Sequence, residues 1–192
     1  MTREAKPSKR ERQVLARQMA KAQGVAVGDH ERMDPCGSSW LIRDDPGFEP
    51  CPWAFQLAHF TPVKPGDRIL DLGCGSGILL MALAQVHPHM GLAVGVDRQE
   101  EAVDQARRNA RLGDHQNMDF FVGDIRTNPS PEQFDIVVSN PPFYPKGWGR
   151  VSPRQAVAEA THALHGDIGD FTKSARAALS PKGRAVFLFD SS

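Results

Sequence analysis

The sequence predicts an α/β protein with a doubly wound, mostly parallel sheet, and three observations support this prediction. From residue 67 onward, short apolar runs alternate with longer amphipathic stretches, as strands and helices do in right-handed crossover units. A glycine-rich turn follows the first apolar run, and acidic residues follow the next two. Ligands of such sheets bind at the carboxyl ends of the strands, so these residues mark the expected site.

The apolar patterns place each element in turn. Strands are expected at 68–73, 92–97, 118–124, 134–140 and 183–189, and helices at 77–86, 98–112, 153–164 and 167–179. The last strand is apolar without alternation, which is typical of a strand that is covered on both faces. The sheet ends after this fifth strand in the sequence. We therefore expect either a longer protein, or cover of that edge by a second copy or by the N-terminal segment.

Three segments differ in composition. Residues 1–24 are expected to form a basic N-terminal helix, and residues 25–66 an irregular lead-in that is rich in Pro, Gly and Asp. One short helix is expected within the lead-in, at 53–60. Residues 67–192 form the expected α/β domain.

The N-terminal helix has a start signal and a weak apolar face. Ser8 and Glu11 have the spacing of a capping box. A thin apolar stripe consists of Leu15, Met19 and Ala22. Residues 1–24 hold seven Lys or Arg against two Glu, although the whole chain has zero net charge. This asymmetry predicts a basic arm that contacts nucleic acid, with a solvated charged surface as the equal alternative.

Composition limits the class of protein. With 192 residues, of which 40% are hydrophobic and 24% charged, the chain is ordinary for a globular protein. It has no long apolar run and no signal-peptide pattern, and its three cysteines lack C-x-x-C spacing. A cytoplasmic protein is therefore expected. No metal is expected, because the spacing of the His and Cys residues between 30 and 59 matches no zinc pattern.

The stretch DLGCGSG at 71–77 predicts a ligand-binding turn. Gly73, Gly75 and Gly77 allow a tight turn and a close approach of the ligand to the backbone. The dinucleotide pattern G-x-G-x-x-G requires glycine at position 78, where Ile78 stands instead. The carboxylate of Asp71 at the strand end suits an ammonium group better than a pyrophosphate.

Acidic residues end the next two strands. Asp97, 20 residues after Gly77, can accept hydrogen bonds from both hydroxyls of a ribose, and a helix N-cap is an equal alternative. Asp124 could accept from the exocyclic amine of adenine while the amide of Ile125 reaches a ring nitrogen; alone, Asp124 is more often a turn residue. An ammonium group, a ribose diol and an adenine, in this order, describe S-adenosylmethionine.

The run NPPF at 140–143 follows an apolar strand directly. Pro141 and Pro142 have no backbone N–H to donate to a sheet, so the strand is expected to end here. The two prolines also fix φ, which holds the Pro141 carbonyl rigidly. The side-chain oxygen of Asn140 and this carbonyl can each accept one N–H of an exocyclic amine, which favours a lone pair facing a methyl donor. Phe143 offers a stacking face for the base, which is worth about 1–3 kcal/mol.

Together these residues resemble the class I S-adenosylmethionine-dependent methyltransferases. The resemblance covers residues 67–189 and depends on 71–77, Asp97, Asp124 and 140–143. It implies S-adenosylmethionine as the cofactor. The N-P-P-[FYW] element implies a planar nitrogen as the acceptor: adenine N6, cytosine N4, guanine N2 or a glutamine amide. Catalysis then needs no metal, since the sulfonium leaving group is already activated and the enzyme orients the reactants.

The residues after this element favour an RNA substrate. Aromatic and basic side chains interleave at Tyr144, Lys146, Trp148, Arg150 and Arg154. This pattern suits unpaired bases and phosphates, with core packing as the alternative for the tryptophan. The stretch from 140 to 179 resembles the tRNA adenine-N6 methyltransferases that modify a base beside the anticodon, which implies tRNA as the partner.

Two other functions stay open. A protein glutamine N5-methyltransferase uses the same element, but it typically carries a separate N-terminal helical domain, for which residues 1–66 are short and rich in Pro and Gly. The other is a non-catalytic scaffold that binds S-adenosylmethionine. The presence of Asn140, Asp97 and Asp124 disfavours it.

Overall fold

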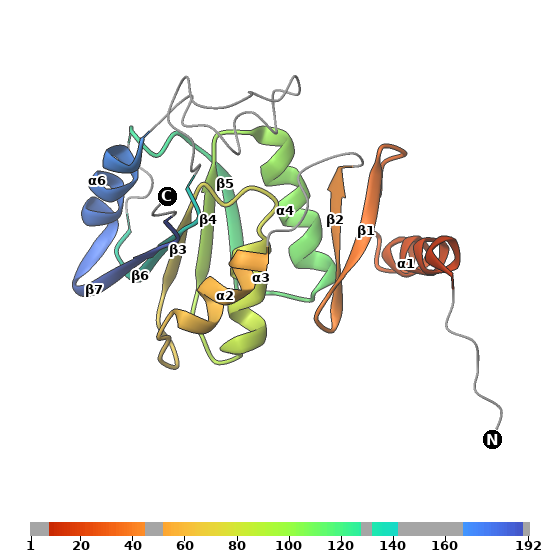
Figure 1. Ribbon diagram of the computed structural model, residues 1–192, viewed down its shortest axis with the longest axis horizontal. Helices are drawn as coiled ribbons and strands as arrows, with labels where there is room; N and C mark the ends of the chain where they lie inside the picture. Colours follow the sequence, from red (N-terminus) through yellow and green to blue (C-terminus); the bar gives the residue numbers. More distant parts are fainter. Residues whose placement is uncertain (1–7, 45–51, 128–131, 142–166, 190–192) are drawn as a thin grey trace.

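The computed structural model describes residues 8–44, 52–127, 132–141 and 167–189 (Figure 1). In chain order these residues form α1 (Lys9–Ala22), β1 (Glu31–Cys36), β2 (Ser39–Asp44), α2 (Pro52–Phe60), β3 (Ile69–Leu72), α3 (Ile78–Val86), β4 (Ala93–Asp97), α4 (Glu100–Leu112), β5 (Met118–Val122), β6 (Phe134–Ser139), α6 (Ile168–Ala178) and β7 (Leu179–Phe187). The helix expected at 153–164 lies outside the described residues.

A parallel five-stranded sheet with the order β5-β4-β3-β6-β7 forms the centre of the fold. From β3 the chain builds outward through β4 to β5, and then returns to the other side of β3 with β6. This reversal confirms the doubly wound fold, and it places a topological switch point between β3 and β6. Asp71 lies opposite Gly95 on β4 and Val138 on β6.

Helices cover both faces of the sheet. On one face, Ile69, Ile136 and Val138 pack against α2, α3 and α4. On the other, Leu70 and Val137 belong to the cluster that packs against α6. All four residues of β3 are buried, three apolar side chains and Asp71, as is typical of a strand that is covered on both faces. Burial of each apolar side chain of this kind contributes about 1.5–3 kcal/mol, which stabilises the central strands.

An antiparallel hairpin of β1 and β2 lies within the segment that the sequence analysis expected to be irregular. The expected short helix is present there as α2, but the hairpin was missed. Gly37, with a φ of 58°, begins a two-residue turn after Cys36. Asp34 and Pro35 interrupt the alternation of apolar and polar residues by which β1 could have been predicted. The hairpin forms nevertheless, since it is stabilised by burial against other elements rather than by strand propensity.

Helix α4 anchors the hairpin through buried polar contacts. The Asn109 side chain accepts from the Ile42 amide at 2.6 Å, and it donates to the carbonyls of Ile42 and Ser76 at 3.0 and 3.1 Å. Arg108 donates to both carboxylate oxygens of Glu31 at 2.7 Å. Asn109 thus connects β2 to the glycine-rich turn, since Ser76 belongs to that turn.

Helix α1 packs on the hairpin at the end of the molecule opposite α6 and β7 (Figure 1). The Ser8–Glu11 capping box is present as expected. The apolar stripe is not the buried face, however: Leu15 and Met19 are about half exposed, whereas Ala16 and Ala20 are fully buried. The small alanines allow a close approach to the hairpin, so the larger residues are left at the surface.

The outer edge of β7 makes no strand pairing among the described residues, where β7 pairs with β6 alone. The expectations of a longer protein or of cover by a second copy stay predictions, whereas α1 of the N-terminal segment lies at the end of the molecule opposite β7 (Figure 1). None of the helices in the described ranges is long and apolar enough to cross a membrane.

Replacing Asn109 with alanine should weaken the fold, because two buried backbone groups of Ile42 and the partly buried carbonyl of Ser76 would lose their partner. We expect the free energy of unfolding to fall by about 3 kcal/mol, since each unsatisfied group costs about 1–3 kcal/mol. Urea unfolding would measure this change. Gln116→Ala, at an exposed site, serves as the control and should change stability by less than about 0.5 kcal/mol. Equal stability of the two variants would show that Asn109 does not anchor the hairpin.

Candidate functional site

The glycine-rich turn between β3 and α3 has the conformation that its sequence predicts. Gly73, Gly75 and Gly77 all have positive φ, at 73°, 51° and 80°. A Cβ atom at Gly75 would meet no atom within 4 Å, so open space lies beside this backbone. A Cβ at Gly77 would instead lie 3.0 Å from the ring of Phe120, which packs beneath the turn. Glycine is therefore needed at both positions for its φ, and at Gly77 also for space.

Asp97 at the end of β4 fixes the turn. Its Oδ2 accepts from the Gly75 amide at 2.9 Å, and its Oδ1 accepts from the Gln99 amide at 3.0 Å. Gln99 is the N-cap of α4, so the alternative role of Asp97 as the N-cap is wrong. Burial raises the pKa of Asp97, although the amide hydrogen bonds oppose this effect. Each oxygen retains a lone pair for a ligand donor.

Asp71 on β3 is buried without a partner. Its side chain is 1% exposed, and neither carboxylate oxygen has a hydrogen-bond donor. Burial, together with the neighbouring negative charge of Asp97, raises the pKa of Asp71 to about 8. A carboxyl group in this state is complementary to a ligand that brings N–H donors and positive charge.

Asn140 follows β6, which is the strand beside β3. Ser139 holds the strand end, because its hydroxyl donates to the Leu72 carbonyl at 2.6 Å and its carbonyl accepts from the Leu188 amide at 3.0 Å. The Oδ1 atom of Asn140 is buried and accepts no hydrogen bond. We call Asp71, Asp97 and Asn140 the acceptor cluster, since all three lie at or directly after the carboxyl ends of the adjacent strands β3, β4 and β6.

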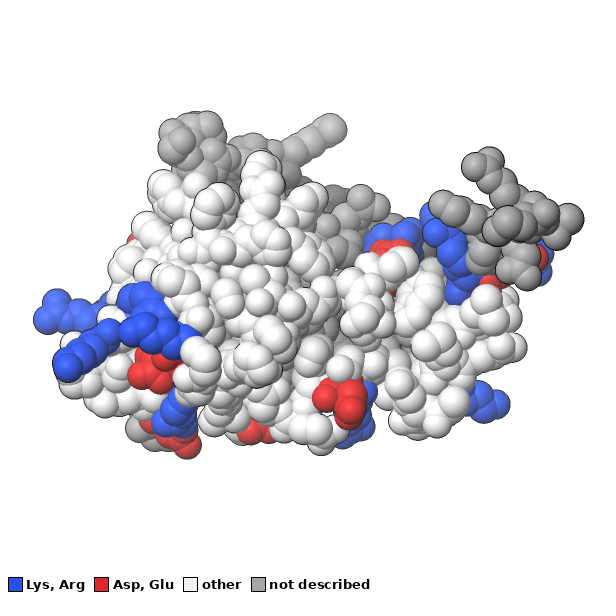
Figure 2. All heavy atoms as spheres, turned by 90° about the horizontal axis from the view of Figure 1, so that it is seen from below, with Lys and Arg blue, Asp and Glu red and all other residues white. Residues whose placement is uncertain are grey.

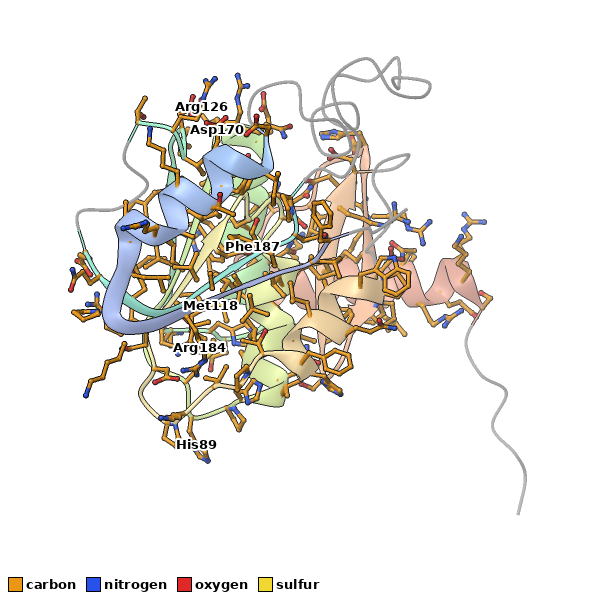
Figure 3. The ribbon with its side chains drawn as sticks, turned by 60° about the vertical axis from the view of Figure 1, so that its left-hand side comes forward. His89, Met118, Arg126, Asp170, Arg184 and Phe187 are labelled. Atoms are coloured by element: carbon orange, nitrogen blue, oxygen red, sulfur yellow. The ribbon has the colours of Figure 1, made fainter. Side chains whose placement is uncertain are left out.

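Asp124 follows β5 and forms an ion pair. Arg126 donates to its carboxylate through Nε at 2.9 Å and through its backbone amide at 2.9 Å. These hydrogen bonds lower the pKa of Asp124 to about 2. Figure 3 shows Arg126 beside Asp170 of α6, whose charge also acts on the guanidinium. The Asp124 carbonyl accepts from the Thr127 amide at 3.1 Å, so the turn role is present, whereas the adenine role stays a prediction.

The structure therefore brings the expected residues of 71–77, Asp97, Asp124, Ile125, Asn140 and Pro141 to the carboxyl ends of β3, β4, β5 and β6. The other expected site residues lie outside the described residues: Pro142, Phe143, Tyr144, Lys146, Trp148, Arg150 and Arg154. Sequence reasoning missed Ser139 and Asn109. Ser139 is a polar residue at the buried end of an apolar strand, and Asn109 is a polar residue on the buried face of α4; these positions were the available signal.

Comparison with known proteins shows the family of the chain. A family model described as a methyltransferase domain matches residues 63–188, which is most of the chain. The chain therefore belongs to the methyltransferase domain family. The matched region begins just before β3 and ends just after β7, so it includes the whole parallel sheet.

Two curated relatives differ in their acceptors. The tRNA1(Val) (adenine(37)-N6)-methyltransferase of Tolumonas auensis is 33% identical over 133 residues, which cover 69% of this chain and 55% of that protein. The release factor glutamine methyltransferase of Aliivibrio fischeri is 39% identical over 88 residues, or 45% of this chain and 30% of that protein. The match to the tRNA enzyme thus spans about half of that relative's length.

A solved structure supports the fold. An S-adenosylmethionine-dependent methyltransferase of Thiobacillus denitrificans, crystallised with S-adenosyl-L-homocysteine, superimposes with a TM-score of 0.50 and 24% identity. The match covers 71% of this chain and 48% of that one.

Replacing Asp97 with alanine should weaken the binding of S-adenosylmethionine, the ligand expected from the sequence. The variant loses the acceptor that holds the Gly75 amide, and with it the expected ribose acceptor. We expect at least a tenfold rise in Kd by calorimetry, since one hydrogen bond to a charged group is worth about 1.5–3 kcal/mol. Asp119→Ala removes an exposed acid on β5 and should leave Kd unchanged. An unchanged Kd in Asp97→Ala would contradict the assignment.

Proposed function

We propose that the protein transfers a methyl group from S-adenosylmethionine to an exocyclic planar nitrogen, and that this nitrogen is adenine N6 in RNA, most favourably in tRNA. The unpaired Oδ1 of Asn140 carries the proposal. A buried acceptor without a donor costs about 1–3 kcal/mol, and an amine that donates to it would recover this cost. Asn140 directly follows β6, which pairs with β3 ahead of the glycine-rich turn, and this position at the switch point of the sheet supports the proposal.

The residues present fit the cofactor. Asp71 lacks a donor and suits the ammonium group, while Asp97 has lone pairs left for the ribose hydroxyls. The Ile125 amide donates to no described residue and could reach an adenine ring nitrogen, with Asp124 beside it for the amine. The open space at Gly75 allows close approach to the backbone. When bound, the cofactor supplies an activated methyl group on a sulfonium.

Asn140 and Pro141 would orient the acceptor. The Asn140 oxygen and the Pro141 carbonyl each take one N–H of the target amine, which turns its lone pair away from these hydrogens. Ser139 fixes the backbone at this point through its contacts with Leu72 and Leu188. Such preorganisation lowers the barrier because the acceptors need no rearrangement during the reaction.

The named tRNA relative and the charge of α1 favour RNA over protein. Four cations of α1 make no side-chain hydrogen bond or ion pair with any described residue: Lys9, Arg10, Arg12 and Lys21. Arg17, by contrast, is committed to the backbone carbonyls of Val27 and Gly28. Figure 2 shows Lys and Arg at both ends of the molecule, with a largely uncharged surface between them. A polyanion would be attracted to the four uncommitted cations.

A glutamine amide is the second candidate, because the release factor glutamine methyltransferase is also similar and an amide offers the same pair of N–H groups. Incubation with methyl-labelled S-adenosylmethionine and either total RNA or total protein would separate the candidates. Nucleoside analysis should find the label in N6-methyladenosine. Label in N5-methylglutamine alone would establish the second candidate, and no label in either pool would favour the non-catalytic scaffold.

Replacing Asn140 with alanine should affect turnover rather than cofactor binding. We expect the single-turnover rate to fall by about a hundredfold or more, which is the scale for removal of one preorganised polar contact. The Kd for S-adenosylmethionine should stay within about twofold. Asn140→Asp keeps an acceptor oxygen and should retain much more activity. A loss of cofactor affinity as large as that of Asp97→Ala would contradict the separate roles.

Replacing the four uncommitted cations of α1 with glutamine should weaken RNA binding. The slope of log Kobs against log salt should become shallower by up to about 3–4, since each of the four phosphate contacts contributes about 0.7–0.9. Cofactor affinity should not change. The control replaces Lys64 and Lys182, which lie near the amino ends of β3 and β7, away from the site. An unaltered slope in the α1 variant would favour the solvated-surface alternative.

A further inference from the structure

Two buried acids of this protein have opposite surroundings. Glu31 is 5% exposed, and its carboxylate receives Arg108, Gln105 and the Gly28 amide. Burial alone would raise the pKa of Glu31, but these partners lower this pKa to about 2. Asp71 is 1% exposed and has no donor at either oxygen. A buried carboxylate is stable only with partners such as those of Glu31, and Asp71 has none.

Among the described residues, no cation acts on the Asp71 carboxyl. Asp97 approaches from β4 with a negative charge, and the Cys74 thiol of the glycine turn has a pKa that burial raises. Asn140 follows β6 with another unpaired acceptor, and α3 contributes apolar side chains and one glutamine. The cations that act on its neighbours are Arg107 of α4, which acts on Cys74, and Arg98, which acts on Asp97. The Arg107 guanidinium donates to the Phe120 carbonyl at 2.7 Å.

We propose that Asp71 is a neutral carboxylic acid in the ligand-free protein and becomes a carboxylate when the ammonium group of the cofactor binds beside it. Its O–H bond breaks, the electron pair stays on the carboxylate, and the proton passes to solvent. This inference depends on the proposed function, because the cofactor supplies the ammonium group. Cofactor entry and proton release are then one linked equilibrium.

The linkage has a definite direction for binding. With a pKa of about 8 for Asp71, about nine in ten molecules hold the proton at pH 7. Binding between pH 6 and 7 should therefore release close to one proton. Affinity should rise with pH, by up to about tenfold per pH unit, because less work is needed to remove the proton. The α-ammonium group itself stays charged in this range.

The ligand-free protein should show the opposite trend in stability. Unfolding exposes Asp71, whose pKa then returns to about 3.9. Between pH 4 and the folded pKa, the folded protein holds a proton that the unfolded chain has lost. The contribution of Asp71 to stability is therefore full at low pH and is lost as the pH rises toward 8. Replacement by asparagine, which is neutral at every pH, should remove this loss.

Calorimetry of the intact protein at pH 6.5 tests the linkage. The binding enthalpy is measured in phosphate and in imidazole buffer, which differ in ionisation enthalpy, so the difference counts the protons released. S-adenosylmethionine and S-adenosylhomocysteine should each release about one proton from the wild-type protein. 5′-Methylthioadenosine keeps the adenine, the ribose and the sulfur but lacks the ammonium group, so it should release none. Asp71→Asn should bind S-adenosylmethionine more weakly at pH 7, without proton release.

The outcomes separate this inference from the proposed function. Failure of the wild-type protein to bind S-adenosylmethionine would overturn the proposed function and this inference with it. Binding without proton release, or release that persists in Asp71→Asn, would overturn this inference alone. Should the variant not bind, urea unfolding of the ligand-free proteins from pH 5 to 8 decides. The inference requires wild type to lose stability relative to Asp71→Asn as the pH rises, and parallel curves would overturn it.

Discussion

Three side-chain oxygens at one edge of the parallel sheet are buried without a hydrogen-bond donor: both of Asp71 and one of Asn140. Among the described residues, only one other buried side-chain atom, Nε of Arg184, shares this condition. Buried acceptors are rarely left unpaired in folded proteins, because each costs about 1–3 kcal/mol. These atoms gather at the carboxyl ends of two adjacent strands, and this indicates a binding site in which a ligand supplies the missing donors. The topology puts them there, since β3 and β6 flank the switch point of the sheet.

The surrounding structure holds this edge in place while satisfying its own polar groups. Asp97 and Asn109 hold the glycine turn from β4 and α4, and Ser139 holds the end of β6 from both sides. The hairpin, although it precedes the sheet in sequence, reaches the turn through Asn109. Glu31, by contrast, is a buried acid whose carboxylate oxygens both accept hydrogen bonds from Arg108 within the chain. Asp71, unlike Glu31, has no such partner.

Much of this arrangement follows from local sequence. The apolar runs of β3, β4 and β6, the glycine turn and the Ser8–Glu11 cap depend on short-range pattern, and the structure has each of them. The hairpin could not be found this way, because Asp34 and Pro35 break its alternation and α4 supplies its packing. The buried face of α1 was missed for a similar reason, since the choice of Ala16 over Leu15 depends on how closely the hairpin approaches. The pairing of Asp124 with Arg126 is a choice of side-chain conformation that the sequence pattern does not determine.

A crystal structure of the protein with S-adenosylhomocysteine would test the central claim most directly. The account predicts the ammonium nitrogen within about 3.2 Å of an Asp71 oxygen, with the ribose hydroxyls at Asp97 and the sulfur facing Asn140. The oxygens of Asp71 would then be paired, as every other buried acid of the described chain already is. A ligand seated away from β3, or one whose ammonium group leaves Asp71 without a donor, would contradict it.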